Sequence, residues 1–281
     1  MAKSKIVIAT NPFRDDEQKF SLNIIKALKD DGHLPVLVTV FDDTNKDNVM
    51  FDLEDAAKDA SLIISVGGDG TFLHVARRVF SLNIPVLGVN MGTKGFLASL
   101  EGNEIEYIRL AAKGEYRISR RMLIDYSIIR SSLIINSATA INDVVIKSDI
   151  SCIGMSIFSD DAKITHFSGD GVIVATPTGS TAYSMSAGGP LVEPEASNLI
   201  VTPICAHAMA NTSFVLSPQR EIIVLPERLN GRRAFLSVDG QEGISLNQGD
   251  RIVINKSEQE LLMADMGIRS FYTTVFRKLS H

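Results

Sequence analysis

Hydrophobic and polar positions follow two different periods along the first 115 residues. Continuous apolar runs at 5–10, 34–41, 61–66 and 84–90 predict buried strands. Apolar residues at helical spacing predict helices at 17–29, 53–60, 72–80 and 103–114. Strands that alternate with helices are typical of βαβ units. We therefore expect an α/β domain with a parallel, Rossmann-like sheet over residues 1–115.

The pattern changes near Tyr116. Short β segments separated by turns occupy the rest of the chain, at 116–130, 133–146, 152–177, 214–226, 232–242 and 250–256. This predicts a second, all-β and sandwich-like domain over residues 116–258. The tail at 259–281 has no clean period, and we expect it to pack back on the first domain.

Composition limits the classes of partner. The chain has 281 residues, of which 45% are hydrophobic, and a formal net charge of −5. An acidic chain argues against nucleic acid as the main partner. The apolar runs are too short for the core of a signal peptide or for a membrane span, so we expect no membrane partner. The two cysteines lack the spacing of a zinc site, and we expect a cytoplasmic, reducing location. A phosphorylated ligand would need positive potential made locally by N–H groups, a few cations or Mg²⁺.

The turn after the strand at 61–66 carries an acid among glycines, in the order Gly67-Gly68-Asp69-Gly70-Thr71. It matches neither the phosphate-binding P-loop nor the dinucleotide fingerprint. A carboxylate there can orient a hydroxyl and accept its proton during phosphoryl transfer. The N–H groups of Gly67, Gly68, Gly70 and Thr71 are candidates for cradling the donor phosphates. Asp69 as the N-cap of the following helix is an equally weighted alternative.

A second stretch, at 168–194, is crowded with hydroxyl groups and turn residues. Such a loop suits a polar ligand such as a nucleotide, and Tyr183 could stack on a ring. The alternative is a loop whose Ser and Thr side chains bond to the local backbone. We give this alternative the lower weight because the run is long.

These motifs resemble a known kinase family. G-G-D-G-T after a strand is similar to the superfamily of NAD kinases, diacylglycerol and sphingosine kinases, and phosphofructokinases. The uninterrupted block from Thr176 to Pro190 resembles NAD kinase specifically. Segments 88–100, 140–146 and 239–241 look like three further motifs of that family, so the resemblance covers most of the chain.

The resemblance implies roles for particular residues. Asp69 would be the base for the 2′-hydroxyl of the adenosine ribose of NAD, with Gly70 beside it. The further residues implied to bind the dinucleotide are His74, Phe96, Asn142, Asp143, Asp170, Thr181, Ala182, Tyr183, Ser184, Met185, Ser186 and Gln241. Simpler alternatives exist for five of these residues: Asn142-Asp143 as a hairpin turn, Asp170 as a turn residue, His74 as a solvent-facing side chain and Phe96 as core.

The chain departs from the family pattern at two positions. Ser168 and Ile153 stand where the family often has a cation. The implied reaction transfers a phosphoryl group from ATP or polyphosphate, with Mg²⁺ or another divalent cation, to NAD. We identify no all-protein metal cage in the sequence, and Mg²⁺ commonly keeps water and phosphate ligands. The resemblance also implies a homo-oligomer, a dimer or a tetramer. A diacylglycerol-type lipid kinase and a non-catalytic dinucleotide sensor are the alternatives.

Overall fold

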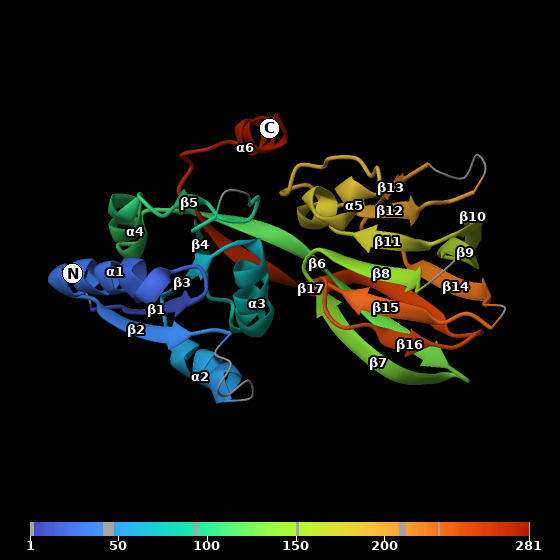
Figure 1. Cartoon of the computed structure of the whole chain (residues 1–281), viewed down its shortest axis with the longest axis horizontal. Helices are drawn as coiled ribbons and strands as arrows, with labels where there is room; N and C mark the ends of the chain where they lie inside the picture. Colours follow the sequence, from blue (N-terminus) through green and yellow to red (C-terminus); the bar gives the residue numbers. More distant parts are fainter. Residues whose placement is uncertain are drawn as a thin grey trace. The chain divides into compact units, whose positions relative to one another are not determined.

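The computed structural model describes residues 3–41, 48–92, 95–149, 152–207, 212–229 and 231–280, without the side chains of 48–52 and 228. The chain divides into two compact units (Figure 1). Unit 1 comprises residues 1–120 and 260–281, and unit 2 comprises residues 121–259. In the described part of the chain, no helix is both long enough and apolar enough to cross a bilayer.

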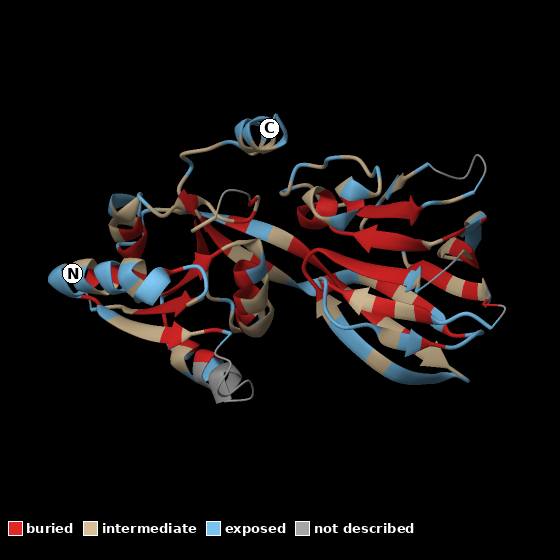
Figure 2. Ribbon diagram, in the orientation of Figure 1, coloured by how far each residue is buried: buried red, intermediate tan, exposed pale blue. Residues whose placement is uncertain are grey.

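Unit 1 is built on a parallel sheet. Its main strands stand in the order β4 (Val86–Asn90), β3 (Leu62–Gly67), β1 (Lys5–Thr10) and β2 (Leu34–Thr39). β3 is buried along its whole length, as a strand covered on both faces requires (Figure 2). The short strand β5 (Leu100–Glu101) pairs with β4, so that Asn90 stands beside Glu101.

Helices form the other layers of unit 1. α1 (Lys19–Asp30) packs with α4 (Ile105–Ala112), and α2 (Asn48–Ala57) packs with α3 (Asp69–Val79). The carboxylate of Asp15 accepts the Phe20 and Ser21 N–H groups at 2.9 Å each. This satisfies two of the free N–H groups at the start of α1, and it explains why the regular helix begins two residues later than the periodicity predicts.

Unit 2 is a β-sandwich. One sheet has the order β13 (Phe214–Leu216), β12 (Leu199–Ile204), β11 (Gly171–Ala175), β8 (Asp143–Ser148), β15 (Ala234–Val238) and β16 (Ile244–Leu246). The other has the order β10 (Ala162–Gly169), β9 (Ile153–Ser159), β14 (Ile222–Arg228) and β17 (Arg251–Asp265), followed by β6 (Arg117–Arg130) and β7 (Leu133–Ala140). Alternate residues of both sheets, such as Val144, Ile146, Met155 and Val224, form one core.

The predicted fold class, a parallel α/β domain followed by an all-β domain, is confirmed. Three strands were not predicted: β5, β12 and β16. β5 and β16 are two and three residues long, and Pro203 interrupts the strand pattern within β12. The tail forms the end of β17 and the helix α6 (Phe271–Leu279), both within unit 1.

Candidate active site

The G-G-D-G-T turn lies at the point in the sheet of unit 1 where the strand order reverses. β1 pairs with β2 on one side and with β3 on the other, so the connections that leave β1 and β3 run in opposite directions. Open α/β sheets bind ligands at this crevice, beyond the carboxyl ends of the strands. Asn11, which follows β1, bridges the crevice because its Nδ2 donates to Thr71 Oγ1 at 2.9 Å.

Asp69 is the first residue of α3, and its side chain does not cap the helix. The N-cap residue is Gly68, which makes no side-chain bond. The Asp69 carboxylate instead accepts the N–H of Phe96 at Oδ2, at 2.8 Å, and the N–H of Leu97 at Oδ1, at 3.2 Å. The N-cap alternative is therefore wrong. Two backbone donors from the loop after β4 hold both carboxylate oxygens in a fixed orientation.

The electrostatic setting of Asp69 favours a proton acceptor. Burial raises the pKa of its carboxyl, and the N–H groups of Phe96 and Leu97 and the charge of Lys278 lower it in part. The loop comes so close that a Cβ added to Gly95 would lie 2.8 Å from Asp69 Oδ1. Only glycine fits at that position without displacing the carboxylate.

His74 and Phe96, two of the predicted dinucleotide-binding residues, both belong to the segments around the turn. His74 is half-buried on α3, and its ring lies 4.4 Å from that of Phe41. Burial, followed by the charges of Arg77 and Arg78, lowers its pKa, so it is predominantly neutral at pH 7. The contact of Phe96 with Asp69 is made by its backbone, and its side chain is half-buried.

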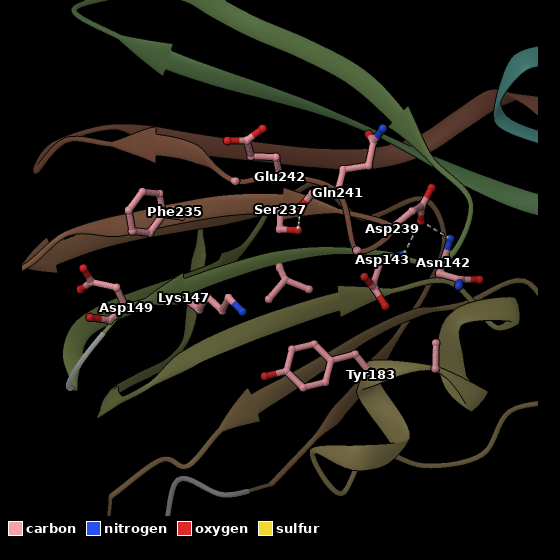
Figure 3. Close-up of a pocket in the computed structure, with 15 residues that line it drawn as sticks. Asn142, Asp143, Lys147, Asp149, Tyr183, Phe235, Ser237, Asp239, Gln241 and Glu242 are labelled. Carbon is pink, nitrogen blue, oxygen red and sulfur yellow. Dashed lines mark hydrogen bonds between the residues drawn. The ribbon is translucent and has the colours of Figure 1, made fainter. Parts of the chain in front are cut away.

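Unit 2 contains a pocket of about 740 Å³ on the outer face of its six-stranded sheet (Figure 3). Tyr183 reaches it from α5 (Tyr183–Ser186) on one side of β8, and Phe235 and Gln241 reach it from β15 and the turn after it. Of the predicted dinucleotide residues in unit 2, the pocket brings together Asn142, Asp143, Ala182, Tyr183 and Gln241. The set combines an aromatic face with amide and carboxyl groups, which suits a sugar and a base.

Asn142 and Asp143 are not a hairpin turn. β7 pairs with β6, whereas β8 begins at Asp143 and pairs with β11 and β15, so the chain changes sheets here. The carboxylate of Asp239 fixes the crossing by accepting the N–H groups of Ile141, Asn142 and Asp143 at 3.0, 2.7 and 3.2 Å.

The same arrangement places two carboxyl groups close together. Asp143 is 4% exposed. Burial, followed by the negative charge of Asp239, raises the pKa of Asp143 to about 7. Its carboxyl is thus partly protonated at neutral pH and can both donate and accept a hydrogen bond.

Strand alternation determines which other residues line the pocket. Asp143, Val145 and Lys147 of β8 face it, whereas Val144 and Ile146 face the sandwich core. Our sequence interpretation did not include Lys147, Phe235 or Asp239. The two-residue period of β8 and β15 would have indicated that Lys147 and Phe235 share a face with the other pocket residues. Asp239 belongs to the motif at 239–241 that resembles the family.

The hydroxyl-rich loop is mainly structural. Thr176 Oγ1 donates to the Ile141 carbonyl at 2.7 Å, Ser180 Oγ donates to the Val192 carbonyl at 3.0 Å, and Ser184 Oγ lies 3.0 Å from Thr202 Oγ1. The hydroxyls of Thr176, Ser180 and Ser184 are buried and take part in these local bonds, whereas the buried Thr178 Oγ1 has no hydrogen-bond partner among the described residues. The pocket wall does not include Thr181, Ser184, Met185 or Ser186.

Asp170 links β10 to β11 and lies among sulfur and imidazole groups. Cys152 Sγ is 3.6 Å from Asp170 Oδ1 and 2.9 Å from His207 Nε2. A hydrogen bond to Asp170 raises the pKa of the exposed Cys205 thiol. Among the residues the structure describes, no group of three His, Cys, Asp or Glu side chains is arranged to hold a metal ion.

Comparisons with known proteins identify the family. The family models of the ATP-NAD kinase N-terminal and C-terminal domains match residues 6–114 and 141–266. The NAD kinase of Acetivibrio thermocellus is 36% identical over 289 residues, covering 98% of this chain and 96% of that protein. The NAD kinase of Ruminiclostridium cellulolyticum is 31% identical over 278 residues, covering 98% and 97%.

Solved structures agree with this assignment. An NAD kinase from Archaeoglobus fulgidus in complex with ATP is 26% identical, with a TM-score of 0.74, covering 99% of each chain. Yeast NADH kinase complexed with NADH shares the fold, with a TM-score of 0.83 at 22% identity, covering 100% of this chain and 87% of that one. The match excludes the lipid-kinase alternative. The chain belongs to the NAD kinase family, whose members are phosphotransferases with an alcohol group as acceptor.

Proposed function

We propose that the protein transfers the γ-phosphoryl group of MgATP to the 2′-hydroxyl of the adenosine ribose of NAD, giving NADP and ADP. The observation that carries this proposal is the Asp69 carboxylate, which lies at the strand-order reversal and is oriented by two backbone N–H groups. The names of the curated relatives support NAD as the substrate, and the ATP complex of the archaeal relative supports ATP as the donor.

Asp69 would act as the base in this reaction. For transfer, the acceptor hydroxyl must come within hydrogen-bond reach of the carboxylate. Because burial raises the pKa of Asp69, its carboxylate is a stronger proton acceptor than an exposed aspartate. The hydroxyl proton passes to the carboxylate as the bond from oxygen to phosphorus forms and the bond to the leaving ADP breaks.

The start of α3 would hold the donor. The first N–H groups of a helix have no acceptor within it, and at Gly68 and Gly70 there is open space where a side chain would stand. Phosphate oxygens can therefore approach Gly68 and Gly70 directly, whereas the other two predicted phosphate-binding residues, Gly67 and Thr71, are buried. The metal of MgATP supplies further charge neutralisation at the phosphates.

The pocket of unit 2 would bind the dinucleotide. Tyr183 offers a ring for stacking, and its side chain is accessible because the residue is 40% exposed. Asn142, Asp143 and Gln241 offer donors and acceptors to the base and the ribose. Gly179 packs on this region so tightly that an added Cβ would lie 2.1 Å from the Asn142 carbonyl oxygen, so it fixes the position of Asn142.

The decisive experiment is an Asp69→Asn variant assayed with NAD, Mg²⁺ and either ATP or polyphosphate. NADP is detected with a dehydrogenase that depends strictly on it. Loss of the base should lower kcat by roughly 10²–10⁴-fold and leave the affinity for NAD, measured by calorimetry, nearly unchanged. Near-full turnover in the variant would refute the assignment of Asp69. NAD binding without NADP formation by the wild type would favour the sensor.

We also propose that the protein is a homo-oligomer in the cytoplasm. Leu133, Ile134 and Ile135 are 69, 65 and 42% exposed on β7, whose one pairing partner among the described strands is β6 (Figure 2). An exposed apolar strand of this kind is suited to a protein interface. Light scattering should give a dimer or tetramer for the wild type and a smaller species for Ile134→Glu. A wild-type monomer would refute the oligomer, and cell fractionation tests the location.

A further inference from the structure

The C-terminal helix places a lysine beside Glu101 of β5, close to the loop that holds Asp69. α6 begins at the N-cap Ser270, whose side chain accepts the Thr273 N–H at 3.1 Å. Near its end, the Lys278 side chain is 8% exposed and its Nζ lies 3.9 Å from Glu101 Oε1. The neighbouring Arg277 is 44% exposed and reaches the same carboxylate at 2.9 Å. A lysine this deeply buried is unusual, because removing an ammonium group from water is costly.

Glu101 connects this helix with the loop that holds Asp69. Its Oε2 accepts Asn90 Nδ2 at 2.9 Å, and the same Asn90 amide donates to the Gly92 carbonyl at 2.8 Å. Asn90 also lies close to the reacting carboxylate, because a Cβ added to Gly95 would stand 3.5 Å from Asn90 Oδ1 and 2.8 Å from Asp69 Oδ1. Successive contacts therefore lead from Lys278 through Glu101 and Asn90 to the surroundings of Asp69.

The charged groups around Asp69 differ in how they influence its carboxyl. On α3, His74 is predominantly neutral at pH 7, and on β5 the carboxylate of Glu101 contacts both Arg277 and Lys278. From α6, the positive charge of Lys278 lowers the pKa of Asp69. The contacts of Lys278 with Glu101, of Glu101 with Asn90, and of the Gly95 position with both Asn90 and Asp69 place Lys278 on the side of the carboxylate from which this charge acts.

Phosphoryl transfer needs positive charge at this place. A carboxylate at the turn repels phosphate oxygens, and negative charge on the transferred group must be stabilised in the transition state. The described residues of the G-G-D-G-T turn itself carry no cation.

We propose that Lys278 is a phosphate-binding residue of the kinase site, with its ammonium group contacting an oxygen of a phosphate bound at the Gly67–Thr71 turn. This inference rests on the proposed function. The phosphate is either the γ-phosphate of ATP or the 2′-phosphate of the product NADP, which have the same recognition chemistry. The lysine forms no bond to phosphorus and exchanges no proton. It offsets the charge of Asp69 and orients the phosphate.

The test compares Lys278→Met, Lys278→Arg and a matched control, Arg277→Met, which removes the exposed cation from the same carboxylate. Lys278→Met should lower kcat/KM by roughly 10²-fold, as expected for one lost contact to a transition-state oxygen. Lys278→Arg should retain most of the activity, and Arg277→Met should stay within a few-fold of the wild type. Melting temperatures of all three proteins show whether they are folded.

Two readouts separate a phosphate contact from a merely structural role. Loss of the lysine charge should shift the acid limb of the kcat–pH profile to higher pH, because the pKa of Asp69 rises, and Arg277→Met should leave that limb in place. A raised KM for ATP identifies the γ-phosphate, and a raised inhibition constant for NADP identifies the 2′-phosphate. Equal effects of Lys278→Met and Arg277→Met on both constants and on the pH profile would overturn the inference. An inactive wild type would instead contradict the proposed function.

Discussion

The buried Asp143 carboxyl gives the sharpest prediction about stability. Its pKa rises from the model-peptide value of 3.8 to about 7 in the folded protein. Between these values the folded state binds the proton and the unfolded state releases it. Stability from this group is therefore fully present below pH 3.8, falls as the pH rises, and is lost above about pH 7.

The magnitude follows from the same pKa. The full rise corresponds to about 4 kcal/mol of unfolding free energy, of which about 2–3 kcal/mol is lost between pH 5 and pH 8. An Asp143→Asn variant removes this dependence and keeps nearly the same side-chain volume. We expect the variant to gain about 2–3 kcal/mol relative to the wild type over that pH interval.

Urea denaturation followed by circular dichroism at pH 5, 6, 7 and 8 measures the effect. Asp161→Asn is the matched control, because it removes the same charge from an exposed turn residue and should follow the wild type at every pH. Asp239→Asn should flatten the pH dependence in part, since the charge of Asp239 is the second cause of the raised pKa. If the curves of wild type and Asp143→Asn run parallel to within about 0.5 kcal/mol, the carboxyl is already ionised at pH 5 and the reasoning fails.

Three further predictions concern activity. Gly95→Ala should lower kcat at least tenfold with little change in the KM for NAD, because its Cβ would lie 2.8 Å from Asp69 Oδ1; steady-state kinetics would contradict this if kcat were unchanged. Tyr183→Ala should weaken NAD binding by about 1–3 kcal/mol and Tyr183→Phe much less, since a stacked ring is lost in one case only; equal calorimetric affinities would exclude stacking. Alkylation of the exposed Cys205 thiol should raise the KM for NAD, because the thiol bonds to Asp170; an unchanged KM after complete modification, checked by mass spectrometry, would remove Asp170 from the binding site.

The central strands of unit 1 could be predicted because their burial is uniform. All six residues of β3 and all five of β4 are buried, so apolar runs alone mark them. Helix ends were less accurate. α1 begins only at Lys19 because Glu17 and Gln18 adopt positive φ angles of 49° and 56°, a local conformation that apolar spacing does not encode.

Asp69 could be predicted from the sequence, but its environment could not. Its two hydrogen-bond donors are backbone N–H groups of Phe96 and Leu97, and any residue type except proline carries such a donor. The role of Asp239 could not be predicted either, because its partners are backbone N–H groups of three residues almost a hundred positions earlier in the chain. Lys278 comes near the loop that holds Asp69 through its contact with Glu101, a residue 177 positions earlier in the chain.

The pocket of unit 2 poses a problem of charge that its geometry helps to resolve. Its wall contains the acidic residues Asp143, Asp149, Asp239 and Glu242, and a dinucleotide brings two further negative charges. Asp149 is paired with Arg233 at 2.7 Å, and three N–H groups bind the Asp239 carboxylate. Asp143 is partly protonated near pH 7, and Lys147 adds a cation on the same face. The repulsion between the pocket and a bound dinucleotide is therefore smaller than the number of acids indicates.

We expect a bound dinucleotide to favour the protonated form of Asp143 and so to raise the pKa of its carboxyl further. NAD affinity should accordingly fall as the pH rises above about 7 in the wild type but not in Asp143→Asn, so that the same carboxyl controls both stability and binding.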